Sequence, residues 1–304
     1  MAIPTNNIRK NEKTYYKRGY LDAIEDHVVI FDGAMGTSIQ NYNLTAEDFG
    51  GGALEGCNDN LVMTRPDVIQ EIHESFLAVG SEVVETDTFR GNRLTLTEYG
   101  LGDITLELNR TAAQIARRAC DIWEEKTGIP RFVAGSIGPS GKLPSGNDPD
   151  LSNITFDELA ELYYEQAQGL VEGGADLLVI ETSQDILEVK AAITGINRYF
   201  DEHNKRVPIQ AQVTLDVSGR MLFGTDIGSA LVTLDPLHID VIGINCSTGP
   251  EYMRQPLQYL AEHSPYPISV LPNAGLPINV DGEAVYPMEP EPFSEMAVSY
   301  THLT

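Results

Sequence analysis

The residue best placed to do chemistry in this sequence is Cys246, which ends an apolar run and precedes a turn. The run 241–245 reads as a buried parallel strand, and Gly249-Pro250 marks where the chain must change direction. Cys246 is therefore expected at the carboxyl end of a strand. In a barrel of alternating strands and helices that end carries the active site, whereas the other end serves stability. A thiolate there suits a soft metal such as zinc.

Polar side chains follow the other apolar runs in the same way. They are Asp32, Glu85 to Asp87, Ser136, Glu181, Thr214 and Asn273. Each could simply be a strand end that meets water, because acids are abundant in this sequence. Buried carboxylates that converge on a cysteine would instead suit a substrate with a cationic amine. We therefore treat these strand-end residues, together with Cys246, as candidates for one site, and their residue types alone do not single out any of them.

Seven strands that alternate with amphipathic helices are predicted to position these residues. The strands are expected at 27–31, 82–89, 131–134, 176–180, 207–215, 241–245 and 268–271. Helices are expected at 66–79 and 106–126, and Thr155 with Glu158 predicts a capped helix that ends at Gly173-Gly174. This alternation predicts an α/β fold, a (β/α)8 TIM barrel, and no helix opens on a dinucleotide-binding glycine motif.

The sequence predicts a barrel that is truncated before strand 8. Residues 1–25 read as an N-terminal arm and helix, residues 26–297 as the barrel, and residues 298–304 as a non-native tail. After Gly275 we expect a proline-rich, acidic loop and the beginning of a helix. An open barrel keeps strand edges that are prone to wrong pairing, so we expect the chain alone to be poorly soluble and inactive.

Composition narrows the class of protein further. The sequence has 45 acidic against 20 basic residues, and this formal net charge of −25 disfavours nucleic acid and anionic membranes as partners. No segment approaches the roughly 18 apolar residues that a membrane helix needs. Three cysteines in 304 residues do not make a disulfide framework. We therefore expect a reducing, cytoplasmic location.

Several separated motifs together resemble one family. They lie at 31–37, 85–89 with Asn92-Arg93, 134–139, 171–176 running into 180–182, 243–246 and 272–277. Through them the chain resembles the homocysteine-binding, amino-terminal module of cobalamin-dependent methionine synthase, within the homocysteine S-methyltransferases. The resemblance implies that zinc holds the thiol of homocysteine as a thiolate, which takes a methyl group from methylcobalamin to give methionine. Cobalamin and methyltetrahydrofolate modules would then lie downstream or in trans.

The resemblance also implies roles for five residues. Cys246 matches one of three zinc thiolates, and the other two belong to a Gly-Gly-Cys-Cys stretch that this sequence does not contain. Asp32, the backbone at Gly33 and Glu181 match the groups that hold the amino acid end of homocysteine. Asn245 is also counted among the substrate-binding residues, because it is expected to support the turn that contains Cys246.

Other interpretations stay open at this point. A homocysteine methyltransferase of the same barrel could use betaine or S-methylmethionine as the methyl donor, and a barrel without its metal ligands could be a non-catalytic binding remnant. Asp87 stands where the family often has asparagine, so its role is open. Cys57 lies in the long first loop, on the face where the metal would be, but the family does not use this position as a ligand. Cys120 lies within a helix. Both are therefore interpreted as structural.

Overall fold

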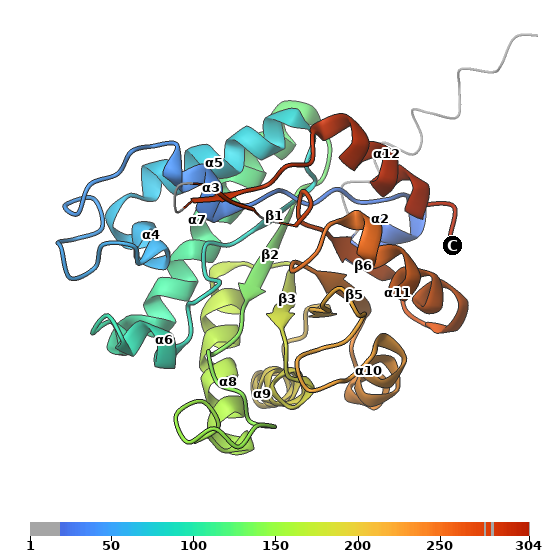
Figure 1. Ribbon diagram of the computed structural model, residues 1–304. Helices are drawn as coiled ribbons and strands as arrows, with labels where there is room; N and C mark the ends of the chain where they lie inside the picture. Colours follow the sequence, from blue (N-terminus) through green and yellow to red (C-terminus); the bar gives the residue numbers. More distant parts are fainter. Residues whose placement is uncertain (1–18, 277, 281–282, 304) are drawn as a thin grey trace, which may run out of the picture. The chain divides into compact units, whose positions relative to one another are not determined.

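A computed structural model describes residues 19–276, 278–280 and 283–303 (Figure 1). The chain divides into two compact units: unit 1 contains the residues up to 136 together with 165–178, and unit 2 contains 137–164 and the residues from 179 onward. Six of the strands in the described residues belong to one sheet, in the order β1-β2-β3-β4-β5-β6. The pairs β1·β2, β4·β5 and β5·β6 are parallel, as strands joined through helices must be.

Unit 1 holds β1 and most of β2, with helices before and between them. Its elements are α2 (Tyr20–Asp26), α3 (Met35–Gln40), η1 (Asn58–Asn60), α4 (Leu61–Thr64), α5 (Pro66–Val79), β1 (Val83–Glu85), α6 (Arg93–Thr97), η2 (Gly102–Ile104), α7 (Thr105–Thr127) and β2 (Phe132–Ile137). Helix α5 begins at Pro66 and ends before Gly80, which takes the left-handed conformation at φ 114°, so its predicted bounds are confirmed. Ile69 and Ile72 pack with Leu108 in the core of this unit.

The predicted first strand at 27–31 is wrong in its extent. Only Phe31 forms a bridge, to Val83, and the amide groups of Glu82 and Val83 both donate to the carbonyl of Ile30. Val28 is 63% exposed and Ile30 is 52% exposed, so they do not have the two buried faces of a parallel strand. An apolar run predicts a buried strand only when neighbours cover it, and here they do not.

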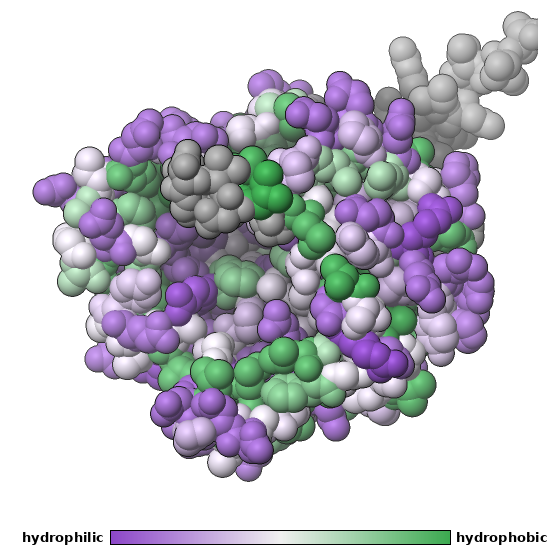
Figure 2. Space-filling view, viewed as in Figure 1, coloured by the Kyte–Doolittle hydropathy of each residue, from purple (hydrophilic) through white to green (hydrophobic). Residues whose placement is uncertain are grey.

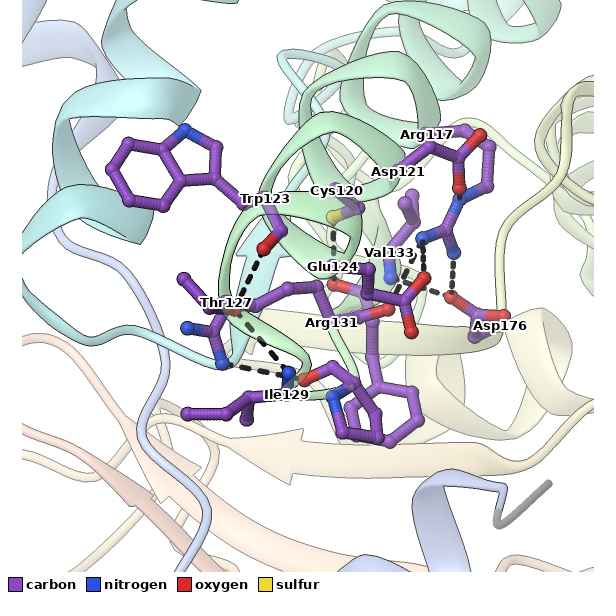
Figure 3. Close-up of polar contacts among 12 residues, drawn as sticks. Arg117, Cys120, Asp121, Trp123, Glu124, Thr127, Ile129, Arg131, Val133 and Asp176 are labelled. Carbon is purple, nitrogen blue, oxygen red and sulfur yellow. Dashed lines mark hydrogen bonds and ion pairs between the residues drawn. The ribbon is translucent and has the colours of Figure 1, made fainter. Parts of the chain in front are cut away.

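An ionic network in unit 1 fixes the C-terminal half of α7 to the sheet (Figure 3). Arg117 lies 2.7 Å from carboxylate oxygens of both Asp121 and Asp176. The same oxygen of Asp176 accepts the backbone N–H of Val133 at 2.7 Å, so one carboxylate joins the helix to β2. Cys120 lies beside this network, fully buried, with its thiol 3.7 Å from the carbonyl oxygen of Phe132. Its predicted position in the core is confirmed.

Unit 2 holds most of β3 and the strands that follow it. Its elements are the first half of α8 (Phe156–Gly173), then β3 (Leu177–Ser183), α9 (Ile186–His203), β4 (Ile209–Val213), α10 (Ile227–Leu234), η3 (Asp235–Leu237), β5 (Val241–Asn245), α11 (Pro250–His263), β6 (Ile268–Leu271), β7 (Ile278–Val280), β8 (Glu283–Val285) and α12 (Pro290–Tyr300). Helix α9 packs on β4, and α11 packs on β6 and on α10 (Figure 1). The predicted strand 268–271 has the observed bounds.

The start of α8 is capped as its sequence predicts. The backbone N–H of Thr155 donates to the carboxylate of Glu158 at 2.8 Å, and the N–H of Glu158 donates to the hydroxyl of Thr155 at 3.2 Å. These reciprocal bonds satisfy two donors that a helix start would otherwise leave open. The helix ends at Gly173, before a left-handed Gly174 at φ 105°.

The segment after Gly275 contains more structure than the predicted loop. Ile278–Val280 and Glu283–Val285 pair as antiparallel strands, and α12 follows. Helix α12 continues through Val298 to Tyr300, whose buried hydroxyl donates to the carbonyl of Pro250. The interpretation of residues 298–304 as a non-native tail stays a prediction.

Gly195 allows helix α9 to approach α8 closely within unit 2. A Cβ atom at this position would overlap the carbonyl oxygen of Ala160 and lie 2.9 Å from the backbone nitrogen of Tyr164. We expect Gly195→Ala to lower the free energy of unfolding by about 1–3 kcal/mol, because the helices must separate. Urea denaturation checks this, with Thr194→Ala on the exposed face of α9 as the control. Equal midpoints for the two variants would contradict the close approach.

The surface is largely hydrophilic on the face that Figure 2 shows, with hydrophobic side chains in smaller groups. Among the helices that the structure describes, none is both long and apolar enough to cross a membrane.

Candidate functional site

Cys246 lies at the carboxyl end of β5, where the sequence places it. All five residues of β5 are buried, and the backbone N–H of Cys246 still donates to the carbonyl of Leu271 at 3.0 Å. Cys246 and Ser247 then take left-handed conformations at φ 56° and 63°, and Thr248 N–H closes the turn on the Cys246 carbonyl at 2.7 Å. Two successive left-handed residues other than glycine are uncommon and are typical of functional sites. The turn leaves Cys246 partly exposed.

The end of β3 brings Glu181 and Thr182 to the same place through Asn245. The Asn245 side-chain oxygen accepts the N–H of Thr182 at 2.9 Å. Its amide nitrogen lies 2.9 Å from the Thr182 hydroxyl, 3.3 Å from a Glu181 carboxylate oxygen and 3.4 Å from Cys246 Sγ. Thr214, just past β4, donates its hydroxyl to the Asn245 carbonyl at 2.9 Å. Asn245 is 1% exposed and therefore holds the ends of three strands together.

Three predicted site residues thus meet in unit 2, and the other two belong to unit 1. The Asp32 carboxylate accepts the backbone N–H of Glu85 with both oxygens, at 3.2 and 3.1 Å. The Asp32 N–H donates to the Val83 carbonyl at 2.9 Å, so the residue continues the pairing begun by Phe31. Gly33 is approached by the ring of Phe76, which a Cβ atom at position 33 would meet at 3.0 Å.

A buried acidic pair, Asp59 and Asp87, lies in unit 1 beside Cys57. Asp59 accepts the N–H of Arg90 at 2.9 Å, and burial raises its pKa to about 6. Burial and then the charge of Asp59 raise the pKa of Asp87 well above its usual range. One oxygen of Asp87 is without a hydrogen-bond partner in the described part of the chain.

The same surroundings keep Cys57 in its thiol form. Cys57 is buried, and burial followed by the charge of Asp59 raises its pKa to about 11. A thiol with so high a pKa is a poor nucleophile. This agrees with the structural role that the sequence predicts for Cys57. The sequence reasoning did not single out Asp59 in this cluster, nor Thr182 beside Cys246.

Comparison with known proteins decides which family this arrangement belongs to. The family described as homocysteine S-methyltransferase matches residues 29–302. The chain belongs to this family. Methionine synthase of Mycobacterium tuberculosis (strain ATCC 25618 / H37Rv) is 40% identical over 292 residues, which cover 95% of this chain and 24% of that protein. Methionine synthase of Mycobacterium leprae (strain TN) is 39% identical over 285 residues, or 94% of this chain and 23% of that protein.

The homocysteine S-methyltransferase family match thus confirms the resemblance that the motifs indicate. The chain spans about a quarter of the length of these two curated relatives. Among solved structures, the homocysteine methyltransferase MmuM of Escherichia coli is similar in both its oxidized and its metallated form. The TM-score is 0.70 in each case, over 84% of this chain and 86% of that chain. At 21% and 20% sequence identity, this likeness shows the fold alone.

A zinc ion in a protein needs several ligands that lie close together. Structural and catalytic zinc sites use three or four protein ligands, mostly cysteine and histidine. Within residues 19–276, 278–280 and 283–303, no three His, Cys, Asp or Glu side chains are grouped so that they could hold a metal. Cys246 is chemically suited to be one ligand, but these residues do not fit a zinc ion by themselves.

Proposed function

We propose that this chain is the homocysteine-binding module of a methionine synthase, in which methylcobalamin methylates the thiol of homocysteine to give methionine. The main support for the proposal is that Glu181, Asn245 and Cys246 lie in contact at the ends of β3 and β5. The chain that holds them belongs to the homocysteine S-methyltransferase family. The identity of 40% to a methionine synthase favours methylcobalamin over other donors. The cobalamin and methyltetrahydrofolate modules would be supplied downstream or in trans.

Glu181 is proposed to bind the ammonium group of homocysteine. Glu181 is 7% exposed, and its carboxylate lies 3.3 Å from the Asn245 amide nitrogen, which orients it. A carboxylate can accept several hydrogen bonds, so the contact with Asn245 is compatible with a charge-assisted bond to an ammonium group. Binding the amino acid there would bring its short side chain toward Cys246. Asp32 and Gly33 stay predicted partners for the amino acid end.

Zinc is proposed as a property of the complete module. When bound, zinc would favour the thiolate form of homocysteine, which is the form that attacks a methyl group. The described residues supply Cys246 and no complete ligand set, so we propose that further ligands come from outside them. The fold of this complete module is proposed to be the (β/α)8 barrel, because the order of β1 to β6 follows the sequence.

Glu181→Gln removes the charge of the proposed ammonium partner while it keeps the size of the side chain. In the complete protein we expect homocysteine affinity to fall by about 1.5–3 kcal/mol, or roughly 10- to 150-fold, because a charge-assisted bond is lost. Calorimetric titration measures this, and the same substitution at the exposed Glu202 is the matched control. Unchanged affinity in the Glu181 variant would remove this residue from the site.

The methyl donor is tested by supplying homocysteine to the complete protein with one donor at a time. We expect methionine from methylcobalamin, and none from betaine or S-methylmethionine. Methionine from betaine or S-methylmethionine alone would replace the proposal with a cobalamin-independent homocysteine methyltransferase. Homocysteine binding without methionine from any donor would point to a non-catalytic binding module.

A further inference from the structure

Thr182 has a backbone conformation that its residue type disfavours. It lies within β3, and its φ is 61°, in the left-handed region. A β-branched residue is a clear outlier there, at a cost of about 1–2 kcal/mol. Asn245 holds the strained residue in place, because its side-chain oxygen accepts the Thr182 N–H at 2.9 Å. Such strain is kept where the surrounding contacts require one arrangement, often at a functional site.

The hydroxyl of Thr182 lies between Asn245 and the sulfur of Cys246. The Asn245 amide nitrogen lies 2.9 Å from Thr182 Oγ1, which accepts its hydrogen. Thr182 Oγ1 lies 3.6 Å from Cys246 Sγ. The amide nitrogen can only donate, so Thr182 Oγ1 accepts from Asn245, and the single hydroxyl hydrogen is donated to the sulfur.

Neither Thr182 nor Cys246 is closed off from a ligand. Both side chains are partly exposed, whereas Glu181 and Asn245 beside them are buried. The Asn245 amide also lies 3.4 Å from the sulfur, so two donors that are bonded to each other approach the same sulfur atom. Their positions are linked, because a movement of Thr182 would break two bonds to Asn245 as well as the bond to sulfur.

We propose that Thr182 is a positioning residue for the Cys246 thiol. Its hydroxyl fixes the direction in which Sγ presents its lone pairs, and the left-handed backbone is what turns the hydroxyl toward the sulfur. The role rests on the proposed function of Cys246 at the homocysteine site. A purely structural role is the alternative, in which the side chain only fills space at the end of β3. In that case an isosteric valine would serve equally well.

Two substitutions in the complete protein separate these roles. Thr182→Val keeps the shape and the β-branch but removes the hydroxyl, and Thr182→Ser keeps the hydroxyl. We expect the valine variant to lower kcat for methionine formation about 10- to 100-fold, the usual effect of losing a group that orients a ligand residue. The KM for homocysteine should change less than about threefold, and serine should restore kcat to within about threefold of the wild type. Valine and serine variants with equal kcat would overturn the proposal.

Alkylation of Cys246 gives a second readout that does not depend on methyl transfer. Iodoacetamide should react with Cys246 in preference to the buried Cys57 and Cys120, and peptide mass spectrometry reports the rate at each cysteine. We expect the rate at Cys246 in Thr182→Val to differ at least about threefold from the rates in wild type and Thr182→Ser. Equal rates in the three proteins would overturn the positioning role. If even the wild type forms no methionine, the proposed function fails, and this comparison still decides the role of Thr182.

Discussion

Cys246→Ser in the complete protein is expected to lower methionine formation from homocysteine by at least about 100-fold. Losing a residue that merely orients a metal ligand costs about 10- to 100-fold, so losing Cys246, the proposed ligand, should cost more. Serine is nearly the same size as cysteine, but its hydroxyl is not deprotonated near neutral pH and is a poor ligand for zinc. Steady-state rates at saturating homocysteine measure the effect.

The fold should survive this substitution. The backbone N–H of Cys246 keeps its bond to Leu271, and the partly exposed side chain fills no core. Ser247→Ala, at the next left-handed position, is the matched control and should keep a rate near that of the wild type. Zinc content should fall in Cys246→Ser alone. Wild-type zinc and a wild-type rate in that variant would contradict the assignment of Cys246.

His73→Leu is expected to make the stability of unit 1 less sensitive to acid. His73 is fully buried on α5, and neither ring nitrogen finds a hydrogen-bond partner among the residues described. Burial lowers its pKa from 6.5 to about 4. As the pH falls below 6.5 the unfolded chain binds a proton that the folded chain does not, so stability is lost progressively until about pH 4. The full loss is about 3 kcal/mol.

The measurement compares urea denaturation of wild type and His73→Leu at pH 7 and at pH 4.5. Between pH 7 and pH 4.5 the wild type should lose about 2–3 kcal/mol more unfolding free energy than His73→Leu does. The same substitution at the exposed His302 is the control for loss of a histidine in general. A difference that stays constant between the two pH values would show that His73 does not stay neutral in the folded protein.

Local sequence signals predicted the regular elements of the fold well. Helix α5 has its predicted bounds because Pro66 sets its start and Gly80 its end. The start of α8 follows from Thr155 and Glu158 three residues apart. Strand β6 likewise has its predicted bounds. These helix and strand boundaries depend on backbone preferences of residues that are close in the sequence, so they can be predicted without knowledge of the fold.

Features that depend on distant neighbours could not be predicted in this way. Val28 and Ile30 look like strand residues, but their exposure depends on what lies beside them in the sheet. The role of Asn245 depends on contacts with Thr182, which is 63 positions away. Asn245 was predicted to support the cysteine turn, but its bonds to Glu181 and Thr182 have no sequence signature. The left-handed conformation of Thr182 could not be predicted either, because threonine normally avoids this conformation.

The site itself was predicted more from resemblance than from periodicity. Periodicity places Cys246 at a strand end, and the structure confirms this position. The choice of Glu181 and Asn245 over other polar strand ends came from the family motifs, and the structure brings both beside Cys246.

Calorimetric titration of the complete protein with L-homocysteine tests the central claim most directly, with L-methionine and L-cysteine as comparison ligands. We predict saturable binding of one homocysteine per chain, weaker binding of methionine, which has no thiol, and a loss of affinity in both Glu181→Gln and Cys246→Ser. A folded, zinc-loaded protein that shows no saturable binding of homocysteine, or that binds it equally well in both variants, would contradict the account.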